Sequence, residues 1–432
     1  MDHLGLDLGT TTISAAVLDA DGRLLCTRTV PGGAAVAGQP WERKQDARGI
    51  EHAALSLLDG LLQEFPDIGC VGLTGQMHGI VYVDAAGQLL SPLYTWQDET
   101  GAQPGPDGKS TAARLTARTG YPLASGYGLV TLACHQAAGT IPDGAAAVCT
   151  IADYLAMRLS GRSAPCLTPS MAASLGLFDG TGFDREAVRR AGLPERLLPE
   201  VSEEAELGGG RLRVFAALGD NQASFLGAGQ GRLDAPLVNI GTGSQFSFFT
   251  KERRTVPGLE TRPFPGGWLL TGAPLCGGRS FALLERFFRQ TAELVTGTPC
   301  PSAYPAMLRA LEAPMPDDVP QFRTTFAGTR QDPAERAVLS GLDEENFAPV
   351  PLLHALLRGM ADELSACYRA ALDAGCLPAG RLLGSGNGLR RNPALQRAVE
   401  RSFGLPLTLA AVPEEAACGA ALFARMQHEA AL

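Results

Sequence analysis

Two strand–turn–strand units, each built around a Gly-Thr turn, constrain the fold of this chain more than any other feature. In the first half, the apolar run Leu4–Leu8 is followed by Gly9-Thr10-Thr11 and then by the apolar run Thr12–Leu18. In the second half, Leu237–Ile240 runs into Gly241-Thr242-Gly243 and another apolar stretch. Glycine lets a tight turn bring its backbone N–H groups close to an anion. The repetition predicts an α/β protein of two related domains, each with a phosphate-binding turn.

Length and composition are those of a globular protein with a sizeable core in each of two domains. The chain has 432 residues, of which 45% are hydrophobic, and its net charge is −9. This charge argues against nucleic-acid binding, which needs a basic face. No basic stretch precedes an apolar one at Met1–Leu4, and the ten cysteines form no C-x-x-C pair. We therefore expect a cytoplasmic protein with reduced thiols, no membrane partner and no zinc site.

An acidic, then glycine-rich stretch from Glu200 to Gly210 is the candidate linker. It predicts an N-terminal domain at 1–210 and a C-terminal domain at 211–432. The expected fold class is α/β, with two actin-like ATPase (ribonuclease H-like) domains and an interdomain cleft that holds a triphosphate. The final helix, which begins near Pro413, is allowed to pack back on the first domain.

Asp7 and the two turns predict phosphate and metal chemistry. Asp7 ends the first strand, where a carboxylate can hold a Mg²⁺ ion through water. Backbone N–H groups and hydroxyls of the turns can bind phosphate oxygens. The alternative is a polar hairpin turn with a local Asx bond. The predicted phosphate-binding residues are Gly9, Thr10, Thr11, Gly241 and Thr242.

Asp220 is the candidate general base. It follows the apolar run Val214–Leu218 and Gly219, and it is followed by Asn221. A carboxylate there can accept the proton of a sugar hydroxyl as the oxygen attacks the γ-phosphorus. Asn221 can hydrogen-bond to sugar hydroxyls. The alternative for Asp220 is a helix N-cap.

Two further segments carry side chains suited to a sugar. Between Gly75 and Gly79 stand Gln76, Met77 and His78, between a predicted strand at Cys70–Leu73 and a return strand at Gly79–Val83. Trp96 and Asp98 combine an aromatic face with a hydrogen-bonding group. A structural histidine and a packing tryptophan are the alternatives.

Together these motifs resemble the FGGY family of carbohydrate kinases nearly end to end. Asp7–Thr12 resembles the family's first phosphate motif, and Gly241-Thr242 the second. Thr74–Gly79 resembles the sugar-pocket segment, and Gly219–Asn221 the segment with the catalytic aspartate. The resemblance also implies an adenosine-binding loop, with Gly384, Gly386 and Asn387 as its contacts, next to the small residues of 416–421.

Within the family, the longer strings resemble bacterial sedoheptulokinases. Among these strings are Ser125–Thr131, Gly219–Phe225 and Cys276–Arg279. One position departs from the family pattern. Many members place an arginine that helps to bind substrate two residues after the Trp-x-Asp aspartate, where this chain has Thr100.

The resemblance implies ATP-dependent phosphorylation of a small ketose, most closely sedoheptulose to sedoheptulose 7-phosphate, with ATP and Mg²⁺ as cofactors. A kinase for xylulose or another pentulose or polyol is the alternative within the same class. A non-catalytic sugar or nucleotide sensor on the same fold is the alternative from another class, although such a protein has no need of Asp220. The expected partners are the sugar and ATP, with a homodimer left open.

Overall fold

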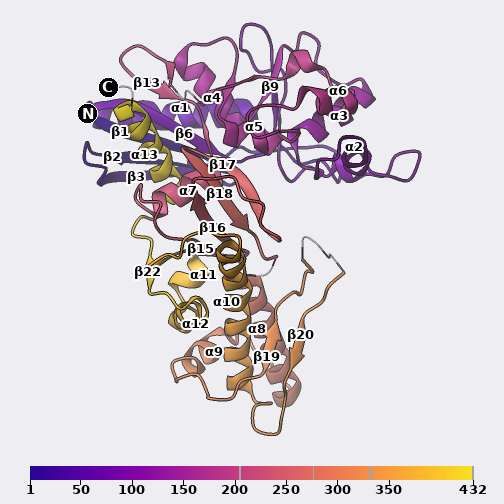
Figure 1. The fold of residues 1–432 in the computed structure, drawn as a ribbon, viewed down its shortest axis with the longest axis vertical. Helices are drawn as coiled ribbons and strands as arrows, with labels where there is room; N and C mark the ends of the chain where they lie inside the picture. The colour runs from indigo at the N-terminus through magenta and orange to yellow at the C-terminus, as the bar shows by residue number, and fades with distance from the viewer. Residues whose placement is uncertain (204–205, 276, 330–331, 333, 431–432) are drawn as a thin grey trace. The chain divides into compact units, whose positions relative to one another are not determined.

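The computed structural model describes residues 1–203, 206–275, 277–329, 332 and 334–430. Its contacts divide the chain into two compact units. Unit 1 comprises Met1–Gly231, Pro263–Pro265 and Val412–Leu432, and unit 2 comprises Arg232–Arg262 and Gly266–Ala411. Figure 1 shows both units as ribbons coloured along the chain.

A twisted sheet forms the centre of unit 1. The order of its main strands is β12-β13-β6-β1-β2-β3, and β14 also pairs with β6. β1 pairs antiparallel with β2 and parallel with β6. Strand β1 is almost wholly buried: Leu4, Leu6 and Leu8 lie on one face, and His3, Gly5 and Asp7 lie on the other. The strands are β1 (Asp2–Leu8), β2 (Thr12–Leu18), β3 (Leu24–Pro31), β6 (Ile68–Gly75), β12 (Glu206–Gly208), β13 (Arg213–Phe215) and β14 (Leu218–Gly219).

Helices and short strands surround this sheet. Asp46 caps α1 through the N–H of Arg48, which fixes where this helix begins. The helices are α1 (Ala47–Glu64), α2 (Thr111–Thr119), α3 (Gly128–Ala138), α4 (Ile151–Ser160), α5 (Pro169–Leu175), α6 (Arg185–Ala191), α7 (Asp220–Ala228) and α13 (Glu415–Ala430), with 3₁₀ turns at Thr100–Ala102 and Glu195–Leu197. The short strands are β4 (Ala35–Val36), β5 (Lys44–Gln45), β7 (Val81–Val83), β8 (Leu93–Tyr94), β9 (Ala147–Cys149), β10 (Cys166–Leu167) and β11 (Glu200–Val201).

The last helix, α13, belongs to unit 1 although it ends the chain. It lies against α7 and against β1, β2 and β6. Glycines allow this close packing: a Cβ on Gly5 would lie 1.9 Å from the carbonyl oxygen of Ala417, and one on Gly72 would lie 2.0 Å from that of Ala420. The C-terminal segment therefore completes the core of the N-terminal unit.

Unit 2 is built on a second sheet with the order β17-β18-β16-β15-β21-β22. β15 pairs antiparallel with β16 and parallel with β21, as β1 does with β2 and β6. The repeated strand–turn–strand pattern of the sequence thus becomes the same local topology in both sheets. The strands are β15 (Leu237–Ile240), β16 (Ser244–Thr250), β17 (Glu260–Phe264), β18 (Gly267–Gly272), β21 (Leu382–Ser385) and β22 (Leu407–Leu409), with a separate pair β19 (Gln321–Arg323) and β20 (Val338–Ser340).

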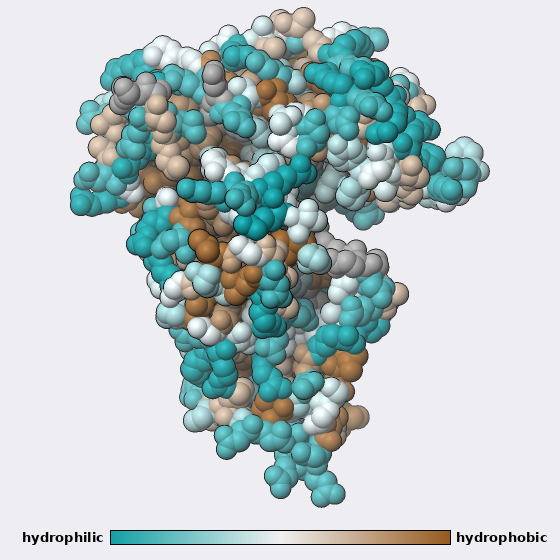
Figure 2. Space-filling model, viewed as in Figure 1, coloured by the Kyte–Doolittle hydropathy of each residue, from teal (hydrophilic) through white to brown (hydrophobic). Residues whose placement is uncertain are grey.

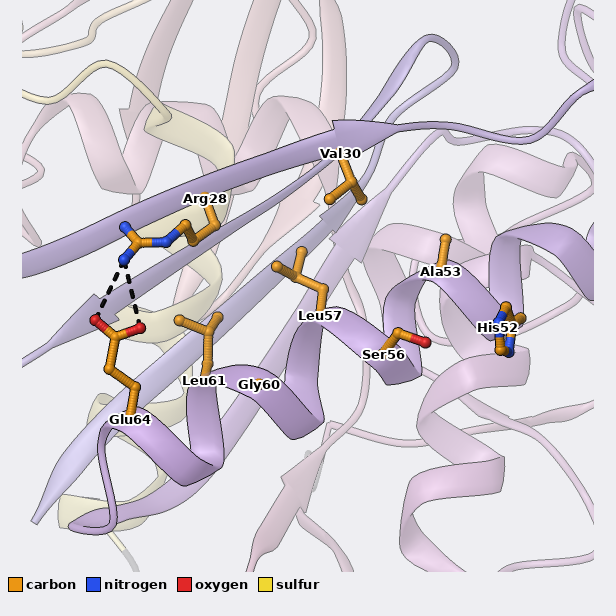
Figure 3. A pocket seen from close by; sticks show the side chains of 9 residues that line it. All are labelled: Arg28, Val30, His52, Ala53, Ser56, Leu57, Gly60, Leu61 and Glu64. Atoms are coloured by element: carbon orange, nitrogen blue, oxygen red, sulfur yellow. Dashed lines mark hydrogen bonds and ion pairs between the residues drawn. The ribbon is translucent and has the colours of Figure 1, made fainter.

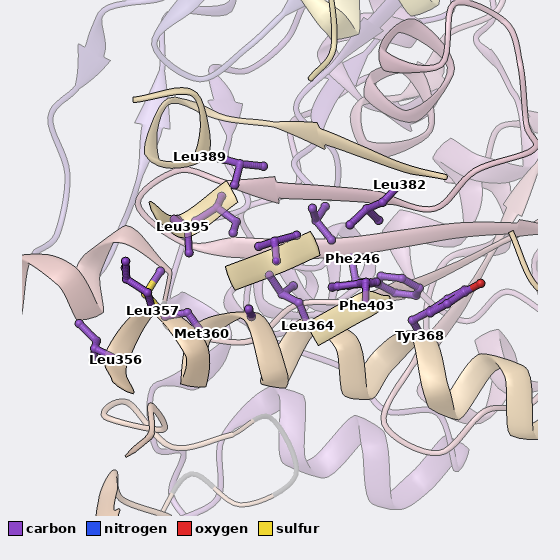
Figure 4. Packing of buried hydrophobic residues seen from close by; sticks show 14 of the residues in the cluster. Phe246, Leu356, Leu357, Met360, Leu364, Tyr368, Leu382, Leu389, Leu395 and Phe403 are labelled. Atoms are coloured by element: carbon purple, nitrogen blue, oxygen red, sulfur yellow. The ribbon is translucent and has the colours of Figure 1, made fainter. Parts of the chain in front are cut away.

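The core of unit 2 lies between this sheet and the long helix α10 (Pro349–Asp373) (Figure 4). Leu356, Met360 and Leu364 recur along one face of α10 and are at most 3% exposed. Asn392 caps α12, and Gly404 ends it with φ +66°, as the sequence predicts. The other helices are α8 (Gly278–Thr296), α9 (Tyr304–Ala310), α11 (Asn387–Arg390) and α12 (Pro393–Phe403).

Two details differ from the sequence-based expectations. The first unit continues to Gly231, about twenty residues beyond the expected boundary at 210, because β13 and β14 pair with β6. The stretch around 204–205 lies outside the described residues, and its flanks form β11 and β12 in place of a linker. The return strand expected after Cys70–Leu73 is β7, which pairs with β9 and not with β6.

Polar residues cover most of the face shown in Figure 2, with apolar residues scattered among them. Among the described helices, none has both the length and the hydrophobicity needed to cross a lipid bilayer.

Candidate active site

Three parallel strand ends bring the predicted functional residues of unit 1 to one edge of its sheet. In the register, Asp7 of β1 lies opposite Thr74 of β6. On the other side of β6, Gly219 of β14 lies opposite Gly75. Gln76 and Asp220 follow these strands directly. Since parallel strands end at the same edge of a sheet, Asp7, Gln76 and Asp220 gather there.

The carboxylate of Asp7 sits in a strongly perturbed environment. Burial, the carboxylate of Asp220 and that of Glu414 raise the pKa of Asp7 from 3.8 to about 7. Like charges held close together disfavour ionisation unless a cation joins them. This edge of the sheet is therefore suited to a positively charged ligand.

Asp220 is the first residue of α7, and the N-cap position belongs to Gly219. Asp220 therefore lies one position after the N-cap, and the N-cap alternative does not describe its place. Asn221 Nδ2 donates to Asp220 Oδ1 at 2.7 Å. This bond orients the carboxylate and is compatible with its ionised form, which accepts hydrogen bonds only.

The turn Gly9-Thr10-Thr11 follows Asp7 directly, and side chains from distant segments hold it. Trp96 Nε1 donates to Thr10 Oγ1 at 3.1 Å. Gln45 Nε2 donates to the carbonyl oxygen of Thr10 at 2.7 Å. A Cβ on Gly9 would lie 2.9 Å from the carbonyl oxygen of Thr12. The turn is thus tight, and its shape is fixed from outside.

His78 adopts a left-handed backbone conformation with φ 73°, which is uncommon for a non-glycine residue. Its N–H donates to Ser174 Oγ at 3.1 Å, and its Nδ1 lies 2.7 Å from the carbonyl oxygen of Ser174. A carbonyl only accepts, so Nδ1 carries the proton in this contact. The ring also stacks on Tyr127 with centroids 4.7 Å apart. Strain of this kind persists where the surroundings enforce it, often at functional sites.

The remaining predicted sugar residues of unit 1 differ in exposure. Trp96 is 47% exposed, whereas Asp98 is 1% exposed and Met77 4%. The Asp98 carboxylate accepts backbone N–H groups from Arg43 at 3.0 Å and from Thr100 at 2.9 Å. These bonds make Asp98 an anchor of its turn, with little surface left for a sugar. Met77 Sδ lies 3.8 Å from Asn221 Nδ2, which links the sugar-pocket segment to the start of α7.

In unit 2, the second turn and the expected adenosine loop come together. Strand β15 pairs with β21 so that Asn239 lies opposite Ser385. The turn at Gly241 therefore lies beside Gly386, whose φ is +87°. A Cβ on Gly386 would lie 2.5 Å from the carbonyl oxygen of Ile240, so only glycine fits this position. Asn387 begins α11 at the same place.

Two observations in unit 2 show what else the predicted nucleotide-binding residues do. The carbonyl oxygens of Gly241 and Thr242 accept the N–H groups of Gly278 and Arg279 at 2.9 and 3.0 Å, which fixes the turn against the start of α8. Gly384 lies inside β21, where a Cβ would lie 2.6 Å from Leu389. Its small size therefore serves packing, and the loop itself begins after it.

Comparison with known proteins identifies both units. Residues 3–230 match the N-terminal domain of the FGGY family of carbohydrate kinases, and residues 237–428 match its C-terminal domain. The chain belongs to the FGGY family of carbohydrate kinases. It is therefore a sugar kinase, and ATP is the phosphate donor of FGGY sugar kinases. The boundary between the two matches agrees with the end of unit 1 near Gly231.

The relatives of this FGGY kinase include sedoheptulokinases and xylulose kinases. The sedoheptulokinase of Mus musculus is 29% identical over 479 residues, with 97% of this chain and 96% of that protein covered. The xylulose kinase of Streptomyces coelicolor is 26% identical over 454 residues, with 97% and 86% covered.

Solved structures confirm the two-domain FGGY kinase fold, of the actin-like class. The xylulose kinase of Rhodospirillum rubrum is similar with a TM-score of 0.82 at 22% identity, over 99% of this chain and 90% of that one. The gluconate kinase of Lactobacillus acidophilus has a TM-score of 0.80 at 18% identity, over 100% and 90%.

The FGGY kinase offers donors suited to a hydrated divalent cation. Among the described residues, no cluster of three or more His, Cys, Asp or Glu side chains could hold a metal ion directly. Asp7, Asp220 and Glu414 nevertheless interact electrostatically. Mg²⁺ keeps several waters and is commonly held by one or two carboxylates plus substrate phosphates. These residues therefore fit a hydrated Mg²⁺ ion.

Three residues of this site have no signal in the sequence. Gln45 and Ser174 reach the site through contacts with residues 35 and 96 positions away. Glu414 precedes the last helix and meets Asp7 only because α13 packs on β1. Contacts between distant segments place all three residues, and no local sequence motif of this FGGY kinase predicts them.

A shallow groove elsewhere in unit 1 contains none of the predicted residues. It lies between α1 and β3, where Leu57 and Leu61 form an apolar floor. Arg28 and Glu64 pair across one end of it at 3.2 Å (Figure 3). The groove is therefore separate from the strand-end site of this FGGY kinase.

Proposed function

We propose that this FGGY kinase transfers the γ-phosphoryl group of ATP to sedoheptulose and forms sedoheptulose 7-phosphate. The observation that carries the kinase site is the meeting of Asp7, Gln76 and Asp220 at the ends of three parallel strands. The choice of sugar is supported by the near full-length similarity to the sedoheptulokinase of Mus musculus. Thr100, in place of the longer arginine of many members, leaves more room for a seven-carbon sugar.

Each residue has a proposed role in the transfer. Asp220 accepts the proton of the attacking hydroxyl while the new O–P bond forms and the bond to ADP breaks in line. Gln76, Met77, His78, Trp96 and Asn221 orient the sugar. Asp98 supports this wall through its turn, since its carboxylate is occupied by backbone bonds.

Each unit carries residues that we assign to the nucleotide. Gly9, Thr10 and Thr11 bind phosphate oxygens in unit 1, and Gly241 and Thr242 bind them in unit 2. Gly386 and Asn387 bind adenosine, and Gly384 supports that loop. Mg²⁺, held near Asp7 through water, would neutralise charge on the β- and γ-phosphates when bound. Asp7 is ionised in that state because a neighbouring cation favours the charged form.

A xylulose kinase is the second candidate. It is supported by the 26% identity to the xylulose kinase of Streptomyces coelicolor over 97% of this chain. This alternative uses the same catalytic residues and changes only the fit of the sugar.

A coupled assay of ADP release across sedoheptulose, xylulose, ribulose, fructose and glycerol tests the proposal. We expect magnesium-dependent turnover that is fastest with sedoheptulose. Turnover with xylulose alone would support the second candidate. Sugar and nucleotide binding with no ADP release above background would support a sensor and contradict the kinase proposal.

A further inference from the structure

A series of hydrogen bonds through Gln45 joins the proposed sugar pocket to the phosphate turn. Gln45 Nε2 donates to the carbonyl oxygens of Thr10 at 2.7 Å and Gly33 at 3.2 Å. Gln45 Oε1 accepts from Gln76 Nε2 at 2.9 Å. Gln45 is 8% exposed and Gln76 3%. The bond between the two glutamines is therefore buried, and the two bonds to the carbonyl oxygens are partly buried. Water competes less for such bonds than for exposed ones.

The groups at the two ends of this series fix which atom donates and which accepts in each hydrogen bond. The carbonyl oxygens of Thr10 and Gly33 can only accept, so the Gln45 amide must turn its nitrogen toward them. Its oxygen then faces Gln76, which must donate. This leaves Gln76 Oε1 as a buried acceptor to which no described residue donates. A buried acceptor without a donor is costly, and a ligand hydroxyl is the kind of donor that it lacks.

A second hydrogen bond joins Thr10 to a proposed sugar-binding residue. Its hydroxyl oxygen accepts from Trp96 Nε1 at 3.1 Å, while its carbonyl oxygen accepts from Gln45. Trp96 and Gln76 are both proposed sugar contacts. Two polar groups of one phosphate-turn residue are therefore tied to the sugar wall, one directly and one through Gln45.

We propose that Gln45 is a positioning residue that sets the phosphate turn and Gln76 in one geometry, so that its loss weakens the binding of both substrates. This inference rests on the proposed function of the two segments. Gln45 itself acts through Thr10 and Gln76. One rigid amide that bonds both segments leaves neither able to move without breaking a buried bond.

The variant Gln45→Met tests the proposal because it keeps the length of the side chain and removes its hydrogen bonds. Isothermal titration measures the affinity for ATP without sugar and for sedoheptulose without nucleotide. We expect each affinity to fall by ~3- to ~10-fold, the usual effect of losing one such bond. The matched control is Gln136→Met, because Gln136 Nε2 also donates to a backbone carbonyl, that of Gly192 at 2.8 Å, away from these residues. It should leave both affinities unchanged.

A second variant separates the bond of Gln45 to Thr10 from its bond to Gln76. Gln45→Glu can still accept from Gln76 but cannot donate to Thr10. We expect ATP affinity to fall as in Gln45→Met, while sedoheptulose affinity stays closer to that of the wild type. This contrast also guards against a general loss of folding, which would weaken both affinities equally in both variants.

Two results would overturn the proposal. In Gln45→Met, either both affinities stay within twofold of the wild type, or only one of them falls. The proposed function can fail separately: a wild type that binds ATP but phosphorylates no sugar would contradict it. The ATP titration would then still decide whether Gln45 holds the phosphate turn.

Discussion

At the scale of single residues, Asp220 is the proposed general base of the phosphoryl transfer. Its carboxylate is oriented by Asn221 at the start of α7 and lies beside Asp7 in electrostatic terms. Asp220→Asn keeps the shape of the side chain but cannot accept the proton. We expect kcat to fall by ~10²–10⁴-fold, with ATP and sugar affinity close to wild type. The control is Asp59→Asn on the exposed face of α1, which should leave kcat unchanged. Near-normal kcat in Asp220→Asn would reject its role as base.

The raised pKa of Asp7 implies that its negative charge, which the proposed function needs, lowers the stability of the folded protein. The folded-state pKa of Asp7 is about 7, against 3.8 ordinarily, so the folded protein holds an additional proton between these values. Its contribution to stability is complete below pH 3.8 and is lost as the pH rises through about 7. Asp7→Asn removes this charge. At pH 8 without ligands, we expect a rise in Tm on the order of 2–4 °C together with loss of turnover.

Calorimetry across pH measures this effect. The gain in Tm from Asp7→Asn should shrink as the pH falls toward 5, where the wild-type carboxyl is already neutral. A gain of equal size at pH 5 and pH 8 would mean that the charge of Asp7 is not its source.

The sequence predicts some of these residues better than others. Asp7, Gln76 and Asp220 could be predicted because each lies at or just after the end of an apolar run that leads into a turn. The hydrogen bond that the Asp98 carboxylate accepts from the backbone N–H of Arg43 could not be predicted, because Arg43 is 55 positions away in the chain. Gln45 was missed for the same reason. Local patterns locate strand ends, whereas hydrogen bonds between distant loops depend on the completed fold.

At the scale of elements, the contact between α7 and α13 positions the start of α7. A Cβ on Gly227 would lie 1.9 Å from the carbonyl oxygen of Glu415, and one on Gly419 would lie 1.8 Å from that of Ala223. Each helix thus places a glycine against the backbone of the other. The repeated topology around β1 and β15 was predictable. The sequence allowed the last helix to pack on the first domain, but it did not identify α7 as the partner, because the contact joins segments nearly 200 residues apart in sequence.

Gly227→Ala tests this contact. The added methyl must push the two backbones apart, so we expect unfolding to become easier by ~1–3 kcal/mol and kcat to fall as Asp220 shifts. Gly60→Ala in α1 is the matched control, since nothing lies within 4 Å of its added Cβ. That change should stabilise the protein by ~0.4–1 kcal/mol. Chemical denaturation measures both, and equal effects would contradict the packing argument.

At the scale of the whole molecule, the chain is a two-domain FGGY kinase whose C-terminal helix returns to the first unit. The sequence predicted two domains and the fold class, but it placed the boundary at 210. Glycines and charges mark flexible stretches, and here they instead precede β13 and β14, which pairing with β6 keeps in unit 1. A boundary is set by which strands pair, and composition alone does not contain that information.

The ratio of kcat/KM for sedoheptulose to that for xylulose is the most direct test of the proposed substrate. We expect a ratio above one. Extra room alone should give a modest preference, since a small change in substrate size is worth ~1–3 kcal/mol in a pocket. The preference should be larger if the additional hydroxyls satisfy buried groups such as Gln76 Oε1. A tenfold or greater preference for xylulose, about 1.4 kcal/mol, would contradict the assignment of sedoheptulose and leave a xylulose kinase on the same catalytic residues.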